Sequence, residues 1–326
     1  MRRSMPSGWV HARAPATIAN VGPGFDVFCL AVRGLSDEVA IRPAAADSLR
    51  VEGLGVDFIP ADFAKNTAGI VIDALRDATG ISQPLEVRVR KGIPAARGLG
   101  SSAASCAAAA LAFLKAFPAS KSLGAEGFIR AAVEGEAAVA GRHYDNVTGA
   151  LLGGFVTIAS TEPLVVAREP VSPRIALAIA VPELVLRTSE MRRVLPDVVP
   201  LRDAVANVGR AATLAFALSR GDIALAGRCL EDRLAEPARS PFLRGFPEAR
   251  AAAIAAGGSG CAISGSGSTV FALAAQPRIA ERVSHAMCNA FQHHDIRATP
   301  IVTSVDNRVP LGEVFPHSGP RFSIPA

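Results

Sequence analysis

The segment Pro94–Ala104 constrains the fold of this 326-residue chain more than any other part of it. Apolar and charged residues alternate just before it, over Leu85–Arg90, and this pattern predicts a half-buried strand. A Gly-Leu-Gly turn at 98–100 and two serines follow, and an alanine-rich stretch then runs to about Ala116. Alanine has the highest helix propensity, and its small side chain lets a helix pack close to a sheet. The sequence therefore predicts a strand, a glycine loop and a buried helix in succession.

A glycine turn that opens a helix is a favourable site for phosphate. Unpaired backbone N–H groups and the positive end of the helix dipole meet there. Glycine also keeps a Cβ atom out of the space that a pyrophosphate would take. Taken alone, these residues are equally consistent with a tight connection in which glycine serves only packing.

Two other phosphate motifs were tested against the same segment. The Walker A pattern is absent, because no Gly-Lys-Ser or Gly-Lys-Thr tripeptide occurs in the chain. The dinucleotide fingerprint is matched in form by Gly98, Gly100 and Ala103, but the first acidic residue after it is Glu126. In that fingerprint the glycine turn directly follows its strand, and an acidic residue is expected about 20 positions after the turn. A nicotinamide-dependent dehydrogenase therefore stays only as an alternative.

Three further groups of residues are candidates for chemistry. Asn20 and Asp26 flank a Gly/Pro loop and could hold a hydroxyl, a carboxylate or an ammonium group. Glu136 and a serine of the glycine turn could supply oxygen ligands to Mg²⁺. Arginines can form a bidentate contact with a carboxylate. Each group alone is equally typical of turn closure or of a solvated surface, and His143 is interpreted as structural because no acyl-transfer nucleophile accompanies it.

Composition excludes several classes of protein. With 50% hydrophobic and 19% charged residues, the chain is expected to fold around a sizeable core. Its net charge of +5 is scattered, which favours a small anionic ligand over nucleic acid. No apolar stretch reaches the roughly 20 residues of a membrane span, and no apolar run follows the N-terminal charges. Five widely spaced cysteines without a C-x-x-C pattern predict buried free thiols and a cytoplasmic protein.

Strands and helices follow one another without strict βαβ alternation, so the predicted fold class is α+β. The boundary is expected at Pro163–Pro173 and divides the chain into domains at 1–165 and 166–326. The expected strands are Trp9–Ala14, Glu38–Arg42, Leu85–Arg90, Leu151–Ala159, Ile175–Val181, Val270–Ala274 and Ala298–Thr303. The expected helices are 66–78, 101–116, Glu126–Ala140, Leu201–Arg220, Asp222–Ala235 and Ile279–Gln292.

Three segments together resemble the motifs of the GHMP kinase superfamily, in the right order. They are Ala14–Asp26, the Pro-x-x-x-Gly-Leu-Gly-Ser-Ser-Ala-Ala pattern of Pro94–Ala104, and the glycine-rich loop Gly260–Thr269. Within the superfamily the chain is most similar to homoserine kinases, through Ala19–Asp26, His143–Val147 and Ser304–Asn307. The resemblance implies a two-domain GHMP kinase fold, with a ribosomal-protein-S5-like N-terminal domain and a ferredoxin-like C-terminal domain.

The resemblance also implies an activity, the transfer of the ATP γ-phosphoryl group to the side-chain hydroxyl of L-homoserine in threonine biosynthesis. Its implied partners are ATP, Mg²⁺ and homoserine, with neither nucleic acid nor membrane involved, and a homodimer is a further expectation. Kinases for threonine, mevalonate or shikimate, and a catalytically silent ATP-binding regulator, remain as alternatives.

Site residues carry over from the family position by position. The expected homoserine-binding residues are Asn20, Asp26, Asn146, Thr188, Arg192 and Arg239, with the arginines on the carboxylate and Asp26 on the ammonium group. The expected ATP-binding residues are Lys91, Pro94, Ala95, Ala96, Arg97, Gly98, Leu99, Gly100, Ser101, Ser102, Ala103 and Ala104. Ser102 and Glu136 would hold Mg²⁺, and the candidate catalytic residues are Asn146, Asp145 and Arg192.

The expected chemistry depends on positioning more than on a base. A phosphoryl-transfer transition state is loose, so that most of the catalysis can come from alignment and charge neutralisation. An aspartate of ordinary pKa is a poor base toward an alkyl hydroxyl, and Asn146 cannot accept a proton. We therefore expect Asn146 to orient the hydroxyl and Asp145 to have an electrostatic or structural role.

Overall fold

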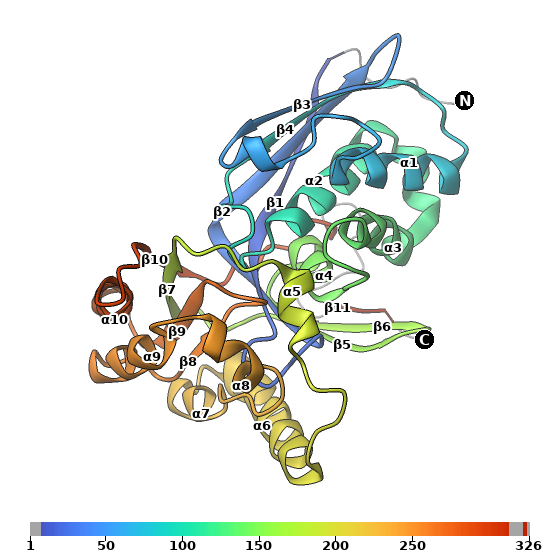
Figure 1. The fold of residues 1–326 in the computed structure, drawn as a ribbon. Helices are drawn as coiled ribbons and strands as arrows, with labels where there is room; N and C mark the ends of the chain where they lie inside the picture. The colour runs from blue at the N-terminus through green and yellow to red at the C-terminus, as the bar shows by residue number, and fades with distance from the viewer. Residues whose placement is uncertain (1–7, 313–321, 325–326) are drawn as a thin grey trace.

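The computed structural model of the chain describes residues 8–312 and 322–324. The first residues of the chain, on which the expected absence of a secretory signal rests, lie outside this range. The described chain forms two β-sheets, each covered by helices (Figure 1). This mixed architecture confirms the predicted α+β class.

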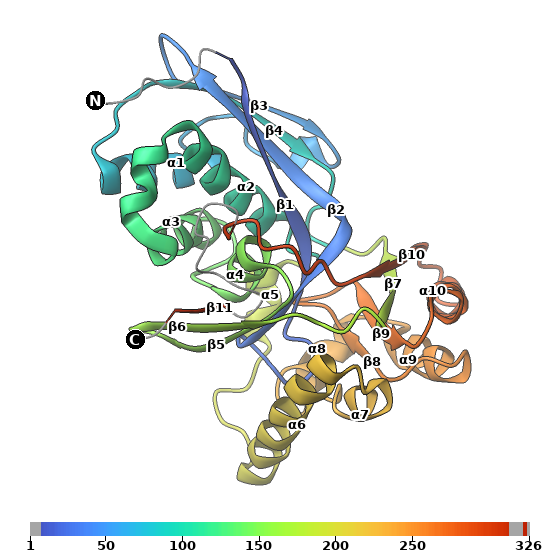
Figure 2. The same ribbon diagram turned by 180° about the vertical axis from the view of Figure 1, so that it is seen from behind.

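The larger sheet is built around one long strand. That strand, β2 (Phe28–Pro43), pairs with β1 (Val10–Ala19), β4 (Leu85–Lys91) and β5 (Phe155–Thr161), always antiparallel. At the edges, β3 (Ser48–Gly53) pairs parallel to β4, and β6 (Leu164–Glu169) lies between β5 and β11 (Phe322–Ile324). The helices α1 (Thr67–Thr79), α2 (Ser101–Ala116), α3 (Gly124–Ala137) and α4 (Asp145–Leu152) gather on one side of this sheet (Figures 1 and 2).

Helix α2 lies at the centre of the N-terminal half. Nearly every one of its residues is buried, because strands β1 and β2 cover one side and the helices α1, α3 and α4 surround the rest. A helix buried all round cannot carry a polar stripe, and its alanines let so many elements approach it. The alanine-rich stretch after the glycine turn is therefore the core helix that the sequence predicts.

The second sheet is smaller and entirely antiparallel in its pairings. Its order is β10 (Ala298–Ser304), β7 (Ala176–Pro182), β9 (Val270–Ala274) and β8 (Cys261–Ile263). Helices α9 (Phe246–Ala255) and α10 (Pro277–Gln292) pack on it around one apolar core. Helices α6 (Leu201–Arg220) and α7 (Ile223–Arg228) contribute to a second core, which also takes residues from β1 and β2.

The segment after β10 returns to the first sheet and fastens the two halves. The backbone N–H of Asp306 donates to Ala31 O at 2.9 Å, and that of Gly154 donates to Asp306 O at 2.8 Å. Asn307 accepts the N–H of Val171 at 2.9 Å and donates to its carbonyl at 2.8 Å. The segment Ser304–Asn307, one of those that resemble homoserine kinases, therefore joins the two halves of the chain and does not line the cleft described below.

Most predicted elements are confirmed, and the differences have local causes. Leu151 and Leu152 end helix α4 rather than begin a strand, because Gly153 has a positive φ of 66° and the helix stops there. The helix predicted over Asp222–Ala235 ends at Arg228, and the residues after it are organised by Asp232 instead. The predicted boundary region, Pro163–Pro173, contains strand β6. The sequence did not predict the short elements β3, β8, α5 (Thr188–Arg193) and α8 (Glu236–Arg239).

Two further expectations concern cysteines and membrane spans. All five cysteines are free and buried, as predicted. Across the described ranges, no single helix has the length and apolar character needed to cross a membrane; α2 with the segment Pro118–Ala137 meets the criterion only as a pair bent by 117°.

Candidate active site

A cleft of about 440 Å³ brings together side chains from both halves of the chain. All six expected homoserine-binding residues line it, although they come from the loop between β1 and β2 and from α4, α5 and α8. Glu136 and Ser102 line it as well, together with His143 and Asp145. The sequence segments chosen for chemistry thus converge on a single cavity.

The glycine turn is held on both sides by the other two motifs. A Cβ atom on Gly98 would lie 2.4 Å from Ser264 O, and one on Gly100 would lie 1.9 Å from the Thr17 hydroxyl oxygen. Both glycines also have positive φ angles, of 77° and 64°. The Ser264 hydroxyl donates to Gly98 O at 2.5 Å. Packing between the motifs therefore requires Gly98 and Gly100, whether or not the turn also binds phosphate.

Only part of the expected ATP-binding segment faces the cleft. Residues 95–98 and 100–102 line it, whereas Leu99, Ala103 and Ala104 are buried in the apolar cores and Pro94 is half-buried outside the lining. Because α2 begins at Ser101, its first N–H groups open toward this lining. The surface offered to a ligand is thus backbone and small side chains at a helix N-terminus.

Lys91 lines the cleft too, but it is buried and its ammonium group is already occupied. It donates to Ser101 O at 2.8 Å, to the Ser105 hydroxyl at 2.7 Å, and to the buried carboxylate of Asp37. The other oxygen of Asp37 accepts the N–H groups of Gly92 and Ile93, at 2.9 and 3.1 Å. This buried ion pair ties the end of β4 to the first turn of α2, and so positions the turn from beneath.

The loop between β1 and β2 has a strained backbone where it meets the cleft. Asn20, Val21 and Asp26 have φ angles of 69°, 47° and 58°, in the left-handed region that such residues seldom adopt. Strain of this kind persists only where surrounding contacts impose it. Here the Asn20 amide donates to Gly265 O at 3.0 Å and accepts the N–H of Asp26 at 3.2 Å. The two short polar side chains are thereby held at the cleft.

Two arginines flank the ring of Phe25 at the same end of the cleft, with guanidinium carbons 5.3 and 5.1 Å from its centroid. Arg192 donates to Asp26 at 2.5 Å, and its Nε is buried without a partner among the described residues. Arg239 is buried and donates to two carbonyls, Met191 O at 3.2 Å and Gly265 O at 2.9 Å. No carboxylate of the described chain lies within 4 Å of it. Burial, and then Arg192, lower the pKa of Arg239.

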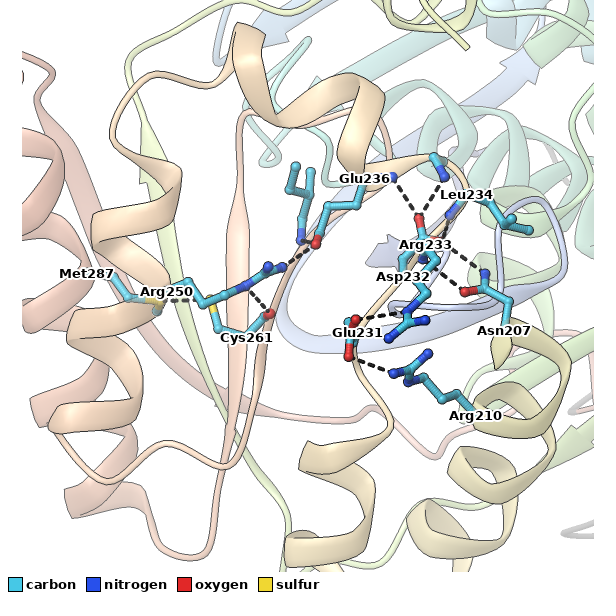
Figure 3. A network of polar contacts seen from close by, with 12 residues as sticks. Asn207, Arg210, Glu231, Asp232, Arg233, Leu234, Glu236, Arg250, Cys261 and Met287 are labelled. Carbon is cyan, nitrogen blue, oxygen red and sulfur yellow. Dashed lines mark hydrogen bonds and ion pairs between the residues drawn. The ribbon is translucent and has the colours of Figure 1, made fainter. Parts of the chain in front are cut away.

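A network of polar contacts lies at the start of α8, the short helix that carries Arg239 (Figure 3). Asp232 accepts the N–H groups of Leu234, Ala235 and Glu236 at 2.8, 3.0 and 2.7 Å, and so caps the short helix that carries Arg239. Asn207 on α6 donates to Asp232 at 2.9 Å and to Pro23 O at 3.2 Å. One amide thus connects the support of Arg239 to the loop that carries Asp26.

Glu136 supplies a buried carboxylate opposite the glycine turn. Its Oε2 atom has no hydrogen-bond partner in the described chain. Burial raises the pKa of Glu136 to about 7, Ser102 opposes the shift, and Asp145 adds to it. An unpartnered carboxylate oxygen beside a serine hydroxyl fits a hard cation such as Mg²⁺, which takes few protein ligands and keeps waters or phosphate oxygens. No cluster of three or more His, Cys, Asp or Glu with metal-binding geometry occurs in residues 8–312.

Asn146 has a defined orientation that involves a residue absent from the sequence predictions. The Thr17 hydroxyl donates to Asn146 Oδ1 at 2.7 Å, and the Asn146 amide nitrogen donates to Asp145 Oδ1 at 3.4 Å, which leaves one of its two N–H groups for a ligand. Asp145 accepts the backbone N–H of Asn146 at 2.8 Å. Burial, and then Asp26, raise the pKa of Asp145 to about 6. The expected ordinary pKa was therefore wrong for this aspartate, because it lies in the protein interior beside another acid.

If Glu136 holds Mg²⁺, binding of the ion is expected to release a proton. A carboxyl group must be deprotonated to bind a metal, whereas Glu136, with a pKa of about 7, is about half protonated at neutral pH. The concentration of Mg²⁺ needed for half-maximal binding should therefore rise as the pH falls below 7. Calorimetry in two buffers of different ionisation enthalpy should detect the released proton, and fewer protons should be released by Glu136→Gln than by the unmodified protein. Equal proton release by the two proteins would contradict the assignment of Glu136 as a metal ligand.

The same pKa values predict the pH dependence of stability without metal. Glu136 and Asp145 bind their protons more tightly in the folded protein than in the unfolded chain, in which Glu and Asp have pKa values near 4.5 and 3.8. Stability falls with pH wherever the folded state holds more protons. The free energy of unfolding should thus decrease as the pH rises from about 4 to about 7, and less so in Glu136→Gln.

Several cleft residues were not predicted from the sequence. The segment Phe58–Pro60 and residues 65–67 line the cleft. Thr17 was not predicted either; it is fully buried outside the lining and acts through its hydrogen bond to Asn146. Asn66 was predicted as a helix cap, which it is, since it accepts the N–H of Ala68 at 2.9 Å. His143 lines the cleft with a buried, unpartnered Nε2 atom among the described residues. No spacing rule would have found Thr17, because its partner lies 129 residues away.

Comparison with known proteins identifies the family. The models for "GHMP kinases N terminal domain" and "GHMP kinases C terminal" match residues 65–154 and 214–293. A homoserine kinase of Natronomonas pharaonis is 39% identical over 297 residues, which cover 91% of this chain and 97% of that protein. One from Thermococcus gammatolerans is 40% identical and covers 89% and 96% of the two chains.

Solved structures agree with the sequence matches. The crystal structure of a homoserine kinase from Cytophaga hutchinsonii superposes with a TM-score of 0.86 at 34% identity, covering 99% of both chains. Since the N-terminal model matches the residues around the glycine turn and the relatives match almost the whole length, the chain belongs to the GHMP kinase family.

Proposed function

We propose that the protein transfers the γ-phosphoryl group of ATP to the side-chain hydroxyl of L-homoserine, giving O-phospho-L-homoserine for threonine biosynthesis. The observation that carries the proposal is the buried guanidinium of Arg239, which donates hydrogen bonds only to carbonyls of the described chain, beside Arg192 and Asp26. A buried cation needs a counterion, and an amino acid brings a carboxylate for the arginines and an ammonium group for Asp26. The names of the relatives support the same substrate.

The cleft provides places for both reactants. Residues 95–102 would receive the triphosphate at the start of α2, and the amino-acid headgroup would lie at the Arg239 end. The second N–H of the Asn146 amide, beside the one that Asp145 accepts, can donate to the acceptor hydroxyl without removing its proton. Positioning for in-line attack is then the main contribution of these side chains.

Glu136 and Ser102 are proposed to hold Mg²⁺. When bound, the ion would neutralise phosphate charge, and the orphaned carboxylate oxygen of Glu136 would be one of its ligands. The residues of the chain provide the rest of the electrostatic environment, with Arg97 in the turn and Arg192 across the cleft.

One assay tests the function and separates the alternatives. The purified protein is incubated with Mg·ATP and a panel of L-homoserine, L-threonine, mevalonate and shikimate, and ADP and the phosphorylated product are measured. Phosphorylation of homoserine is expected to be the fastest. Preference for an acceptor without an amino-acid headgroup would refute the substrate assignment, and ATP binding without transfer would indicate a silent regulator. A dehydrogenase is disfavoured, because the sheets lack the doubly wound parallel order that it would need.

Asp145→Asn is expected to reduce kcat by less than about tenfold. Water, which is about as weak an acid as an alkyl hydroxyl, has a pKa of about 15.7, so even a carboxylate of pKa about 6 is a poor base for it. The variant keeps the shape and the acceptor for the N–H of Asn146. Steady-state kcat for homoserine is the measurement. A loss of 10³-fold or more would assign Asp145 the role of general base.

Three coarser features complete the proposal. The chain is proposed to divide into two domains between Glu169 and Ala176 rather than at residue 165, since β6 belongs to the first sheet and β7 to the second. A cytoplasmic location agrees with five buried, unpaired thiols. A homodimer is proposed as the assembly.

A further inference from the structure

Helix α6 carries a stripe of exposed apolar side chains. Leu201, Val205, Val208 and Phe216 are between 62% and 79% exposed, and Ala212 between them is exposed too. Their spacing places them on one face of the helix. Leu201, Val205, Val208 and Ala212 follow one another at intervals of four, three and four residues, which is the spacing of a helix–helix seam. Val198, just before the helix, is 85% exposed. Exposed apolar patches of this kind mark interaction surfaces.

The opposite face of α6 is already used within the chain. Leu214, Ala217 and Leu218 belong to the apolar core, and Asn207 forms the contacts of Figure 3. In Figure 1 the helix projects from the C-terminal half, at the bottom of the view. The exposed stripe is thus a second, unoccupied face of a helix whose first face is fixed.

The stripe is complementary to itself when two copies run antiparallel. A two-fold axis between Val208 and Gly209 places Leu201 opposite Phe216 and Val205 opposite Ala212 of the partner subunit. Gly209 has open space where its Cβ would be, so the two helices can approach closely at the axis. An interface that contacts its own copy through the same patch is the arrangement that two-fold symmetry demands.

The charges near the ends of the stripe agree with the same register. Arg220 lies four residues after Phe216 and touches its ring, with the guanidinium carbon 5.6 Å from the centroid. Asp197 lies four residues before Leu201, is exposed, and forms no ion pair within the described chain. The antiparallel pairing brings Arg220 of one subunit to the end of the helix at which Asp197 of the partner subunit lies.

We infer that α6 is the homodimer interface, formed by antiparallel pairing with α6 of a second copy. This inference rests on the proposed homodimer and is independent of the substrate. It assigns the two faces of one helix to two tasks, since the inner face reaches the loop of Asp26 through Asn207.

Two cysteine variants test the register. Val208 lies half a residue from the axis, so the two copies of Val208→Cys should form an intersubunit disulfide under mild oxidation. Leu201→Cys is the matched control in the same stripe, because its two copies would lie roughly 20 Å apart at about 1.5 Å per residue. The five native cysteines are buried and should not react. Cross-linking of Val208→Cys alone is expected.

Mass measurement completes the test. Light scattering of the unmodified protein should give twice 33.6 kDa, and Val208→Asp should shift it toward the monomer. Ile254→Asp, at a 50% exposed apolar residue of α9, should leave the dimer intact. A monomer at all concentrations would overturn both the homodimer and its interface. A dimer in which Val208→Cys does not cross-link, or Leu201→Cys cross-links equally, would overturn only the helix pairing. Phosphorylation of homoserine, assayed separately, decides the function without regard to either outcome.

Discussion

Glu136→Gln is expected to lower kcat by about 10²- to 10³-fold, the usual cost of removing one electrostatic contact to the transition state. Gln keeps the volume of the side chain and its place in the buried wall of the cleft. It removes the charge, however, and the orphaned oxygen of Glu136 becomes part of a neutral amide. The measurement is kcat over a range of Mg²⁺ concentrations, which should also show a raised requirement for the metal.

Glu134 provides a matched control for that variant. It lies on the same helix two residues earlier, is half-buried, and pairs with the exposed Arg142 at 2.6 Å. Because surface ion pairs contribute little, Glu134→Gln should keep kcat and the Mg²⁺ dependence near those of the unmodified protein. If Glu136→Gln behaves like Glu134→Gln, Glu136 is not a metal ligand.

Arg239→Met is expected to raise KM for homoserine by about 30-fold to several thousand-fold while KM for ATP changes little. Loss of one partner of a buried charge pair costs about 2–5 kcal/mol, which corresponds to that range. Methionine fills much of the space of the arginine stem, but it leaves the substrate carboxylate with Arg192 alone. Arg239→Lys should fall between the two, since one ammonium group cannot reproduce the fork that contacts Met191 O and Gly265 O.

Arg244→Met is the control for the second variant. Arg244 is an exposed arginine of the same region and donates to His294 O at 2.7 Å, away from the cleft. It should leave both KM values unchanged. Thermal unfolding of each variant separates loss of binding from loss of structure. An unchanged KM for homoserine in folded Arg239→Met would refute the carboxylate assignment.

The predictions that succeeded rest on local physical chemistry. The alternation of Leu85–Arg90, the Asn66 cap and the alanine-rich helix after the turn depend on residues close in sequence. Binary pattern and capping determine such elements, so the fold class followed from them. The resemblance to a family then supplied the candidate site residues that converge on the cleft.

The parts that could not be predicted depend on residues distant in sequence. Thr17 orients Asn146 across 129 positions, and Asp37 binds Lys91 across 54. The raised pKa of Asp145 follows from burial, which no single sequence reveals. Asp232 reorganises the chain after Arg228, so that a helical pattern ends early there. In each case a tertiary contact overrides or completes the local preference.

The return of the chain end to the first sheet has a consequence for synthesis of the protein. Asp306 and Asn307 bind Ala31, Gly154 and Val171, and β11 adds the last strand beside β6. A ribosome makes the N-terminal half first, and domains generally begin to fold as they emerge. Here the first sheet lacks these contacts until residues 306–324, which follow the whole second sheet in the chain, have been translated. Until then β6 has no partner on its outer side, so the first sheet is completed only after the second has been synthesised.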